Sequence, residues 1–151
     1  MPDNLEQHRP TPDWGLAPVS VPTPNSLTID IVLVHGLNSS RTKPWTNRHD
    51  DFWPSWIVDD VPGARVWVYG YNSSVWLTDS KDHLMVHSVK FLESLANAKV
   101  GLKGNEDHQQ PIPVVFVGHS LGGVLVKQVR DVSHVRVRLT LLGTHYCSYQ
   151  E

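Results

Sequence analysis

The stretch PVVFVGHSLGGVLVKQVR, residues 113–130, is the part of this chain that indicates a fold most clearly. After the proline, four apolar residues run together, which is typical of a parallel strand buried on both faces. The residues after Ser120 are compatible with a helix, and glycines stand at positions 118, 122 and 123. The stretch therefore predicts a sharp turn between a strand and a helix, with Ser120 at its tip.

Residues 118–122 read G-H-S-L-G, the pattern of a nucleophile elbow. Gly118 and Gly122 leave room for the backbone to bend, so that the serine hydroxyl stays exposed. The amide of Leu121 would point at a developing oxyanion, where the helix dipole also favours negative charge. A phosphate-binding loop is the alternative, but the segment lacks both the GxGxxG spacing and the GxxxxGK[ST] lysine. We therefore predict that Ser120 is a nucleophile, on an elbow that also includes His119 and Gly123.

A second motif, His35-Gly36-Leu37, follows the apolar run from Leu27 to Val34. A nucleophile elbow needs another backbone donor from the loop after a neighbouring strand. The amides of Leu37 or Gly36 are the candidates for this oxyanion-hole donor. A plain turn after a strand is the alternative interpretation of the same residues.

The rest of the chain alternates strand and helix patterns, which predicts an α/β fold with a parallel sheet and helices on both faces. The apolar residues Met85, Val89, Leu92 and Leu95 or Ala96 recur at helical spacing. The other predicted elements are a short helix near 52–58, a strand at 65–69, a helix from 80 or 82 to 98, a surface connection at 100–110 and a strand at 135–142.

The amino-acid composition excludes several classes of function and location. Thirteen Lys and Arg stand against fifteen Asp and Glu, so nucleic acid is not an expected partner. Six of the eleven prolines lie in residues 1–26, which predicts a disordered leader rather than a signal peptide. No apolar run is long enough to span a bilayer, and the single cysteine, Cys147, fits a reducing, intracellular compartment.

No metal or organic cofactor is expected. His83 and His87 share a helix face at a spacing that metal sites use, but no glutamate follows His83 and no third ligand is evident. A solvated helix face is the favoured interpretation. The neighbouring carboxylates at 59–60 and 106–107 are likewise expected to be solvated.

Three blocks together resemble the lipase-like serine esterase domain: IVLVHGLNSS, WPSWIVDDVPGARVWVYGYNSS and PVVFVGHSLGGVLVKQ. This family includes relatives of GPI inositol-deacylase, serine-active-site proteins of mitochondria and endoplasmic reticulum, and N-terminal domains of NACHT, ankyrin and tetratricopeptide proteins. The resemblance covers about residues 27–129. The resemblance implies that the substrate is an ester or a lipid. For location it implies either peripheral contact with a mitochondrial or endoplasmic reticulum membrane or a place in the cytoplasm. By position it makes Ser120 the nucleophile, places Gly36, Leu37 and Leu121 at the oxyanion hole, and puts Tyr71 and Asn72 at the pocket rim.

The order of a catalytic triad in such folds is serine, then acid, then histidine, and only 31 residues follow Ser120. Asp131, His134 and His145 are the Asp and His residues among them, and His145 is the candidate base because it follows the last predicted strand. We expect residues 27–151 to form a truncated α/β-hydrolase fold with an uncovered sheet edge that promotes self-association. The alternatives are a non-catalytic interaction or sensor module and a fragment of a larger hydrolase or of a NACHT or repeat protein.

Overall fold

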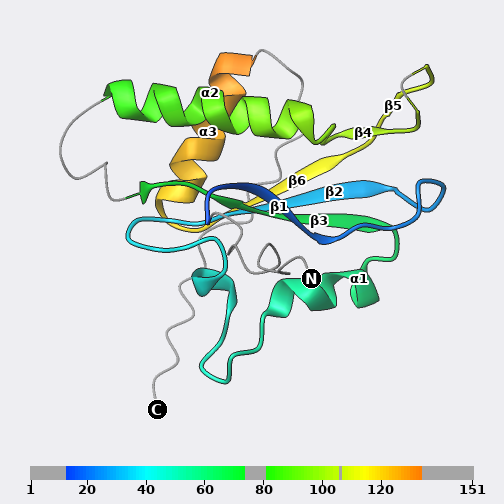
Figure 1. Ribbon diagram of the computed structural model, residues 1–151, viewed down its shortest axis with the longest axis horizontal. Helices are drawn as coiled ribbons and strands as arrows, with labels where there is room; N and C mark the ends of the chain where they lie inside the picture. The colour runs from blue at the N-terminus through cyan, green and yellow to red at the C-terminus, as the bar shows by residue number, and fades with distance from the viewer. Residues whose placement is uncertain (1–12, 74–80, 106, 134–151) are drawn as a thin grey trace, which may run out of the picture.

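The computed structural model describes residues 13–73, 81–105 and 107–133 (Figure 1). Its centre is a four-stranded sheet in the order β1-β3-β2-β6. The central strand β2 (Ile29–Val34) pairs in parallel with β3 (Ala64–Gly70) on one side and with β6 (Val114–Gly118) on the other. The predicted α/β class with a parallel sheet is confirmed. The strand predicted at 135–142 lies outside the described residues.

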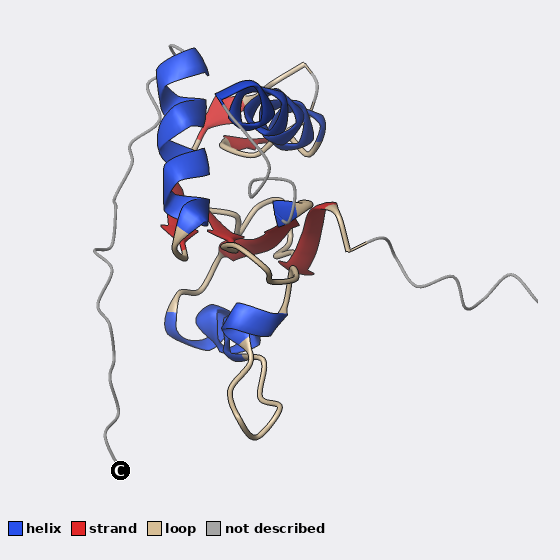
Figure 2. Cartoon of the chain, turned by 90° about the vertical axis from the view of Figure 1, so that its left-hand side faces the viewer, coloured by secondary structure: helices blue, strands red, loops and turns tan. Residues whose placement is uncertain are grey.

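Helical segments cover both faces of the sheet, as predicted (Figure 2). On one face lie α2 (Lys81–Asn97) and α3 (Leu121–Ser133), which pack over a core that includes Phe91, Phe116 and Leu125. The other face is covered by η1 (Lys43–Trp45), η2 (Trp53–Trp56) and the one-turn helix α1 (Ile57–Asp60). Both faces of the sheet are therefore shielded from solvent, which explains why β2 is almost continuously apolar.

Helix α2 exists where it was predicted, but only part of the predicted apolar stripe faces the core. Met85 and Val89, expected to point inward, are 45% and 42% exposed. Leu95 of the predicted stripe is buried, and so is Phe91, which lies outside the stripe. The Phe91 ring stacks on Tyr69 with 4.2 Å between ring centroids. The large aromatic contact with β3 thus decides the rotation of the helix about its axis.

The prediction of a disordered leader over residues 1–26 is wrong where the structure describes it. β1 (Gly15–Ser20) pairs antiparallel with β3, and its register shifts between Pro18 and Ser20. Proline is tolerated on an edge strand because its missing N–H can face away from the neighbour. The sheet therefore begins before residue 27, whereas residues 1–12 lie outside the described part of the chain.

The amino ends of β2 and β3 are joined through a buried carboxylate that the sequence patterns did not single out. Asp30 is fully buried, and Arg65 donates to its two oxygens from Nε at 2.6 Å and from Nη2 at 2.8 Å. Asp30 also accepts from the indole N–H of Trp67 at 2.8 Å and from the amide of Gly101 at 2.7 Å. The last bond ties the sheet to the 100–110 connection, which contains the small hairpin of β4 (Leu102–Lys103) and β5 (Gln110–Pro111).

Candidate active site

Ser120 occupies the turn between β6 and α3, which is the strand–turn–helix context expected of it. Its φ is +54°, in the left-handed region that residues other than glycine rarely adopt, and its side chain is exposed. A residue held in this conformation costs free energy and persists only when its surroundings fix it. The backbone at Ser120 is therefore determined by its packing.

Two glycines of the elbow allow this packing. A Cβ at Gly122 would lie 2.2 Å from the carbonyl oxygen of Val34 and 2.6 Å from that of His35. A Cβ at Gly118 would lie 2.6 Å from the backbone of Gly123. The first turn of α3 thus presses directly against the end of β2, and a larger residue at position 122 has no space.

The same contact brings the two sequence motifs together. A Cβ at Gly36 would lie 2.8 Å from both the His119 carbonyl oxygen and the Ser120 Cβ. The amide of His119 also donates to the Val34 carbonyl oxygen at 2.9 Å. Gly36 therefore packs directly against Ser120, and Leu37, the next residue, is exposed.

The backbone amide of Leu121 is the other predicted oxyanion donor. Leu121 is the first residue of α3, and amides in the first turn of a helix have no partner within the helix. The positive end of the α3 dipole lies at the same place. This arrangement suits a site where negative charge develops next to Ser120.

His35 holds the loop in place, a role that the sequence did not reveal. Its ring is fully buried and stacks on Tyr71 with 4.5 Å between centroids. Nε2 accepts a hydrogen bond from the Tyr71 amide at 3.1 Å, so the proton of the neutral ring is on Nδ1, which donates to the Gly36 carbonyl oxygen at 2.7 Å. Burial lowers the pKa of His35. His35 is thus a neutral positioning residue with both ring nitrogens engaged.

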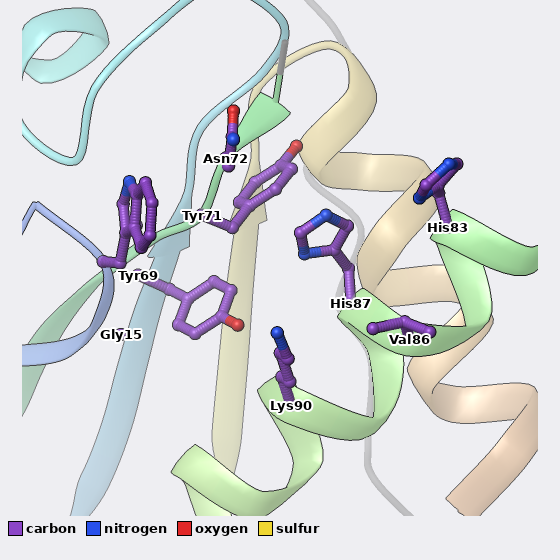
Figure 3. A pocket seen from close by; sticks show the side chains of 10 residues that line it. Gly15, Tyr69, Tyr71, Asn72, His83, Val86, His87 and Lys90 are labelled. Carbon is purple, nitrogen blue, oxygen red and sulfur yellow. The ribbon is translucent and has the colours of Figure 1, made fainter. Parts of the chain in front are cut away.

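Tyr71 is buried, and its hydroxyl donates to the His35 carbonyl oxygen at 2.9 Å. Burial raises the pKa of Tyr69 to about 12. Burial also raises the pKa of the Tyr71 hydroxyl above its ordinary value. Tyr71 and Asn72, the residues expected at a pocket rim, both line a cavity of about 310 Å³ beside α2 (Figure 3). Ser120 is not among the residues that line this cavity.

His83 and His87 line the same cavity and are half-buried, so the helix face that carries them is partly covered rather than fully solvated. The face of α2 that carries them turns toward Tyr69 and Tyr71, and the rings of His87 and Tyr71 lie 5.5 Å apart. No group of three or more His, Cys, Asp or Glu that could hold a metal ion occurs in the described part of the chain. The carboxylates Asp59 and Asp60 are exposed, as predicted.

We predict that Tyr71→Phe loosens residues 35–37, because it leaves the buried His35 carbonyl oxygen without its donor. The free energy of unfolding should fall by about 1–3 kcal/mol. Amide hydrogen exchange at 35–37 should become faster. Tyr69→Phe is the matched control, since its hydroxyl meets Ser94 instead, and exchange at 35–37 should not change. Unaltered exchange in Tyr71→Phe would contradict the anchoring role.

Trp45 is a further neighbour of the elbow that the sequence did not identify. Its indole is 4% exposed and meets the His119 ring edge-on, with 6.4 Å between centroids. The indole N–H has no hydrogen-bond partner among the described residues. Trp45 thus supports the turn by packing on the face opposite α3.

The acid and the base of a triad are not identified. His134 and His145 lie outside the described residues, and Asp131 belongs to α3 without a described side chain. Among the residues that the structure describes, no carboxylate or imidazole is in hydrogen-bond contact with the Ser120 hydroxyl. His145 stays a prediction as the base.

Comparison with known proteins gives partial matches. The chain is similar to Protein SERAC1 of Danio rerio (28% identical over 131 residues), of Bos taurus (27% over 129) and of Homo sapiens (25% over 124). Each match covers 71% of this chain, and the chain spans only 18% of the length of the relative. No family model and no solved structure matches. None of the described helices is long and apolar enough to cross a membrane. The chain thus combines an α/β fold with a distant similarity to a segment of Protein SERAC1.

Proposed function

We propose that this chain carries the nucleophile half of a serine hydrolase that acts on carboxylic esters, including lipid esters, with Ser120 as the nucleophile. The observation that supports this most strongly is the backbone conformation of Ser120, which is left-handed at the turn from a strand to a helix. Gly36 of the HGL motif packs against this turn. Strained, exposed residues of this kind occur where chemistry needs a fixed and accessible side chain. Location at a mitochondrial or endoplasmic reticulum membrane, or in the cytoplasm, is proposed from the family resemblance alone.

In this reaction the Ser120 oxygen attacks the ester carbonyl carbon, and the carbonyl electrons move to the oxygen. The amides of Leu121 and Leu37 donate to that oxyanion, and the dipole of α3 stabilises the same charge. A base accepts the serine proton and passes it to the departing alcohol. Water then hydrolyses the acyl-serine, which releases the acid and restores the hydroxyl. His145 is our candidate for the base.

Labelling with a fluorophosphonate tests the nucleophile. This reagent needs less help from a base than an ester does, so folded protein should label slowly at Ser120, and Ser120→Ala should abolish labelling. Ser55→Ala, which removes an exposed hydroxyl far along the chain, is the control and should label like the parent protein. Labelling that persists in Ser120→Ala would refute the assignment.

A non-catalytic interaction or sensor module is the second candidate function. It is favoured by the lack of an acid–base pair at Ser120 among the described side chains. In that case the folded protein should label at Ser120 no faster than the urea-unfolded chain does, because a serine that the fold does not activate stays protonated and weakly nucleophilic. The same experiment therefore separates the two candidates.

A further inference from the structure

A cavity of about 310 Å³ lies between α2 and the edge of the sheet formed by β1 and β3. The residues that α2 contributes include His83, His87 and Lys90, which share one helix face because they are spaced by four and three residues. His87 and Lys90 point from α2 toward Tyr69 and Tyr71 on the sheet side (Figure 3). The cavity thus has one wall of nitrogen-bearing side chains and one wall of aromatic rings.

The wall of the cavity formed by α2 favours a ligand with negative charge. Lys90 carries a positive charge, the imidazoles of His83 and His87 can each donate an N–H, and no carboxylate is present among the described residues that line the cavity. Burial lowers the pKa of His87, and the neighbouring Lys90 and His83 lower it further. The site thus disfavours the charged form of His87, and an anion bound there would pair with Lys90 and favour protonation of that imidazole.

The opposite wall suits a flat or short apolar group. The rings of Tyr69 and Tyr71 are nearly parallel, with 6.0 Å between their centroids. Trp14, immediately before β1, also lines the cavity and is 65% exposed. An exposed indole beside stacked tyrosines is a surface on which an aromatic ring or a short acyl chain can pack.

We propose that this cavity binds a phosphate group attached to an aromatic or short acyl body. The phosphate oxygens would accept from Lys90 and from the imidazoles of His83 and His87, and the body would lie against Tyr69 and Trp14. Phosphate suits this wall better than a carboxylate, since it has more acceptor oxygens and a larger charge for three donors. The ligand can be a soluble phosphomonoester or a lipid with a phosphate headgroup. The proposal does not depend on the reactivity of Ser120.

Calorimetric titration of the full 151-residue chain tests this assignment. 1-Naphthyl phosphate should bind, whereas 1-naphthol, which lacks the charge, inorganic phosphate, which lacks the body, and 1-naphthoate, with a single charge, should each bind more weakly. Dihexanoyl phosphatidate is titrated as the lipid ligand. If it binds more tightly than 1-naphthyl phosphate, the cavity is a site for a lipid headgroup; if it binds more weakly, the cavity is a site for a soluble phosphomonoester. If 1-naphthol, inorganic phosphate or 1-naphthoate binds as tightly as 1-naphthyl phosphate, the proposal is wrong.

Variants locate the site. Lys90→Gln should weaken binding of 1-naphthyl phosphate on the order of fivefold, because it removes one charge-assisted hydrogen bond. Lys127→Gln is the matched control on the exposed surface of α3 and should bind like the parent protein. Lys90 is exposed at the cavity mouth, so its replacement should leave the melting temperature unchanged. Equal affinity in Lys90→Gln and Lys127→Gln, or no binding by the parent protein, would overturn the proposal while leaving fluorophosphonate labelling of Ser120 intact.

Discussion

Gly122→Ala is expected to lower the free energy of unfolding by about 3 kcal/mol, whereas Gly123→Ala should raise it by about 0.5–1 kcal/mol. A Cβ at position 122 would overlap the carbonyl oxygens of Val34 and His35, which are backbone atoms at the end of β2 and cannot rotate away. A Cβ at position 123 would meet nothing within 4 Å, and alanine is favoured over glycine inside a helix. Two adjacent substitutions in one turn of α3 should therefore have opposite signs.

Urea denaturation of the two variants and the parent protein measures this difference. Gly122→Ala should also suppress fluorophosphonate labelling, because pushing α3 away from β2 releases the conformation of Ser120. Gly123→Ala should label like the parent protein. Equal stability of the two variants would show that α3 does not press on the end of β2 as described.

The central elements were predictable because their signals are local. The apolar run before His35 and the strand pattern at 65–69 need no knowledge of distant residues, and both became parallel strands. The elbow is local as well, since its glycines, its serine and the flanking strand and helix lie within one continuous stretch. The structural context of Ser120 could thus be derived from the sequence.

β1 and the orientation of α2 were not predictable in the same way. Proline density argues against regular structure, but pairing with β3 outweighs this local preference at the edge of the sheet. Met85 and Val89 fit a helical stripe as well as Phe91 does, and only the contact of Phe91 with Tyr69 decides which face is buried. Tertiary packing, rather than helical periodicity, determines both features.

The supporting contacts of the site are also long-range. His35 and Tyr71 are 36 positions apart, and neither residue type indicates that the two will stack and exchange hydrogen bonds. His83 and His87 showed a helical spacing, but the wall opposite them comes from β3 and the start of β1. The cavity therefore became visible only once the sheet and α2 were placed together.

Asp30→Ala is expected to lower the free energy of unfolding by about 3–5 kcal/mol, a large part of the stability of an ordinary domain. Asp30 interrupts an apolar strand, and its carboxylate is the shared acceptor for Arg65, Trp67 and Gly101. Its removal leaves a largely buried guanidinium, an indole N–H and a backbone N–H without that acceptor. Arg65 would keep its bonds to the carbonyl oxygens of Lys99 and Leu102, which reduces but does not cancel the penalty.

Asp30→Asn separates the charge from the hydrogen bonds. The amide keeps one acceptor oxygen but places an N–H₂ group among donors, so we expect a loss smaller than that of Asp30→Ala yet above about 1 kcal/mol. Asp59→Ala is the exposed control in α1 and should change stability by no more than about 0.5 kcal/mol. Chemical denaturation ranks the three variants, and hydrogen exchange at Gly101 should speed up in both Asp30 variants, because that amide anchors the β4–β5 connection to the sheet. A midpoint for Asp30→Ala equal to that of Asp59→Ala would show that the buried carboxylate does not hold the amino ends of β2 and β3 together.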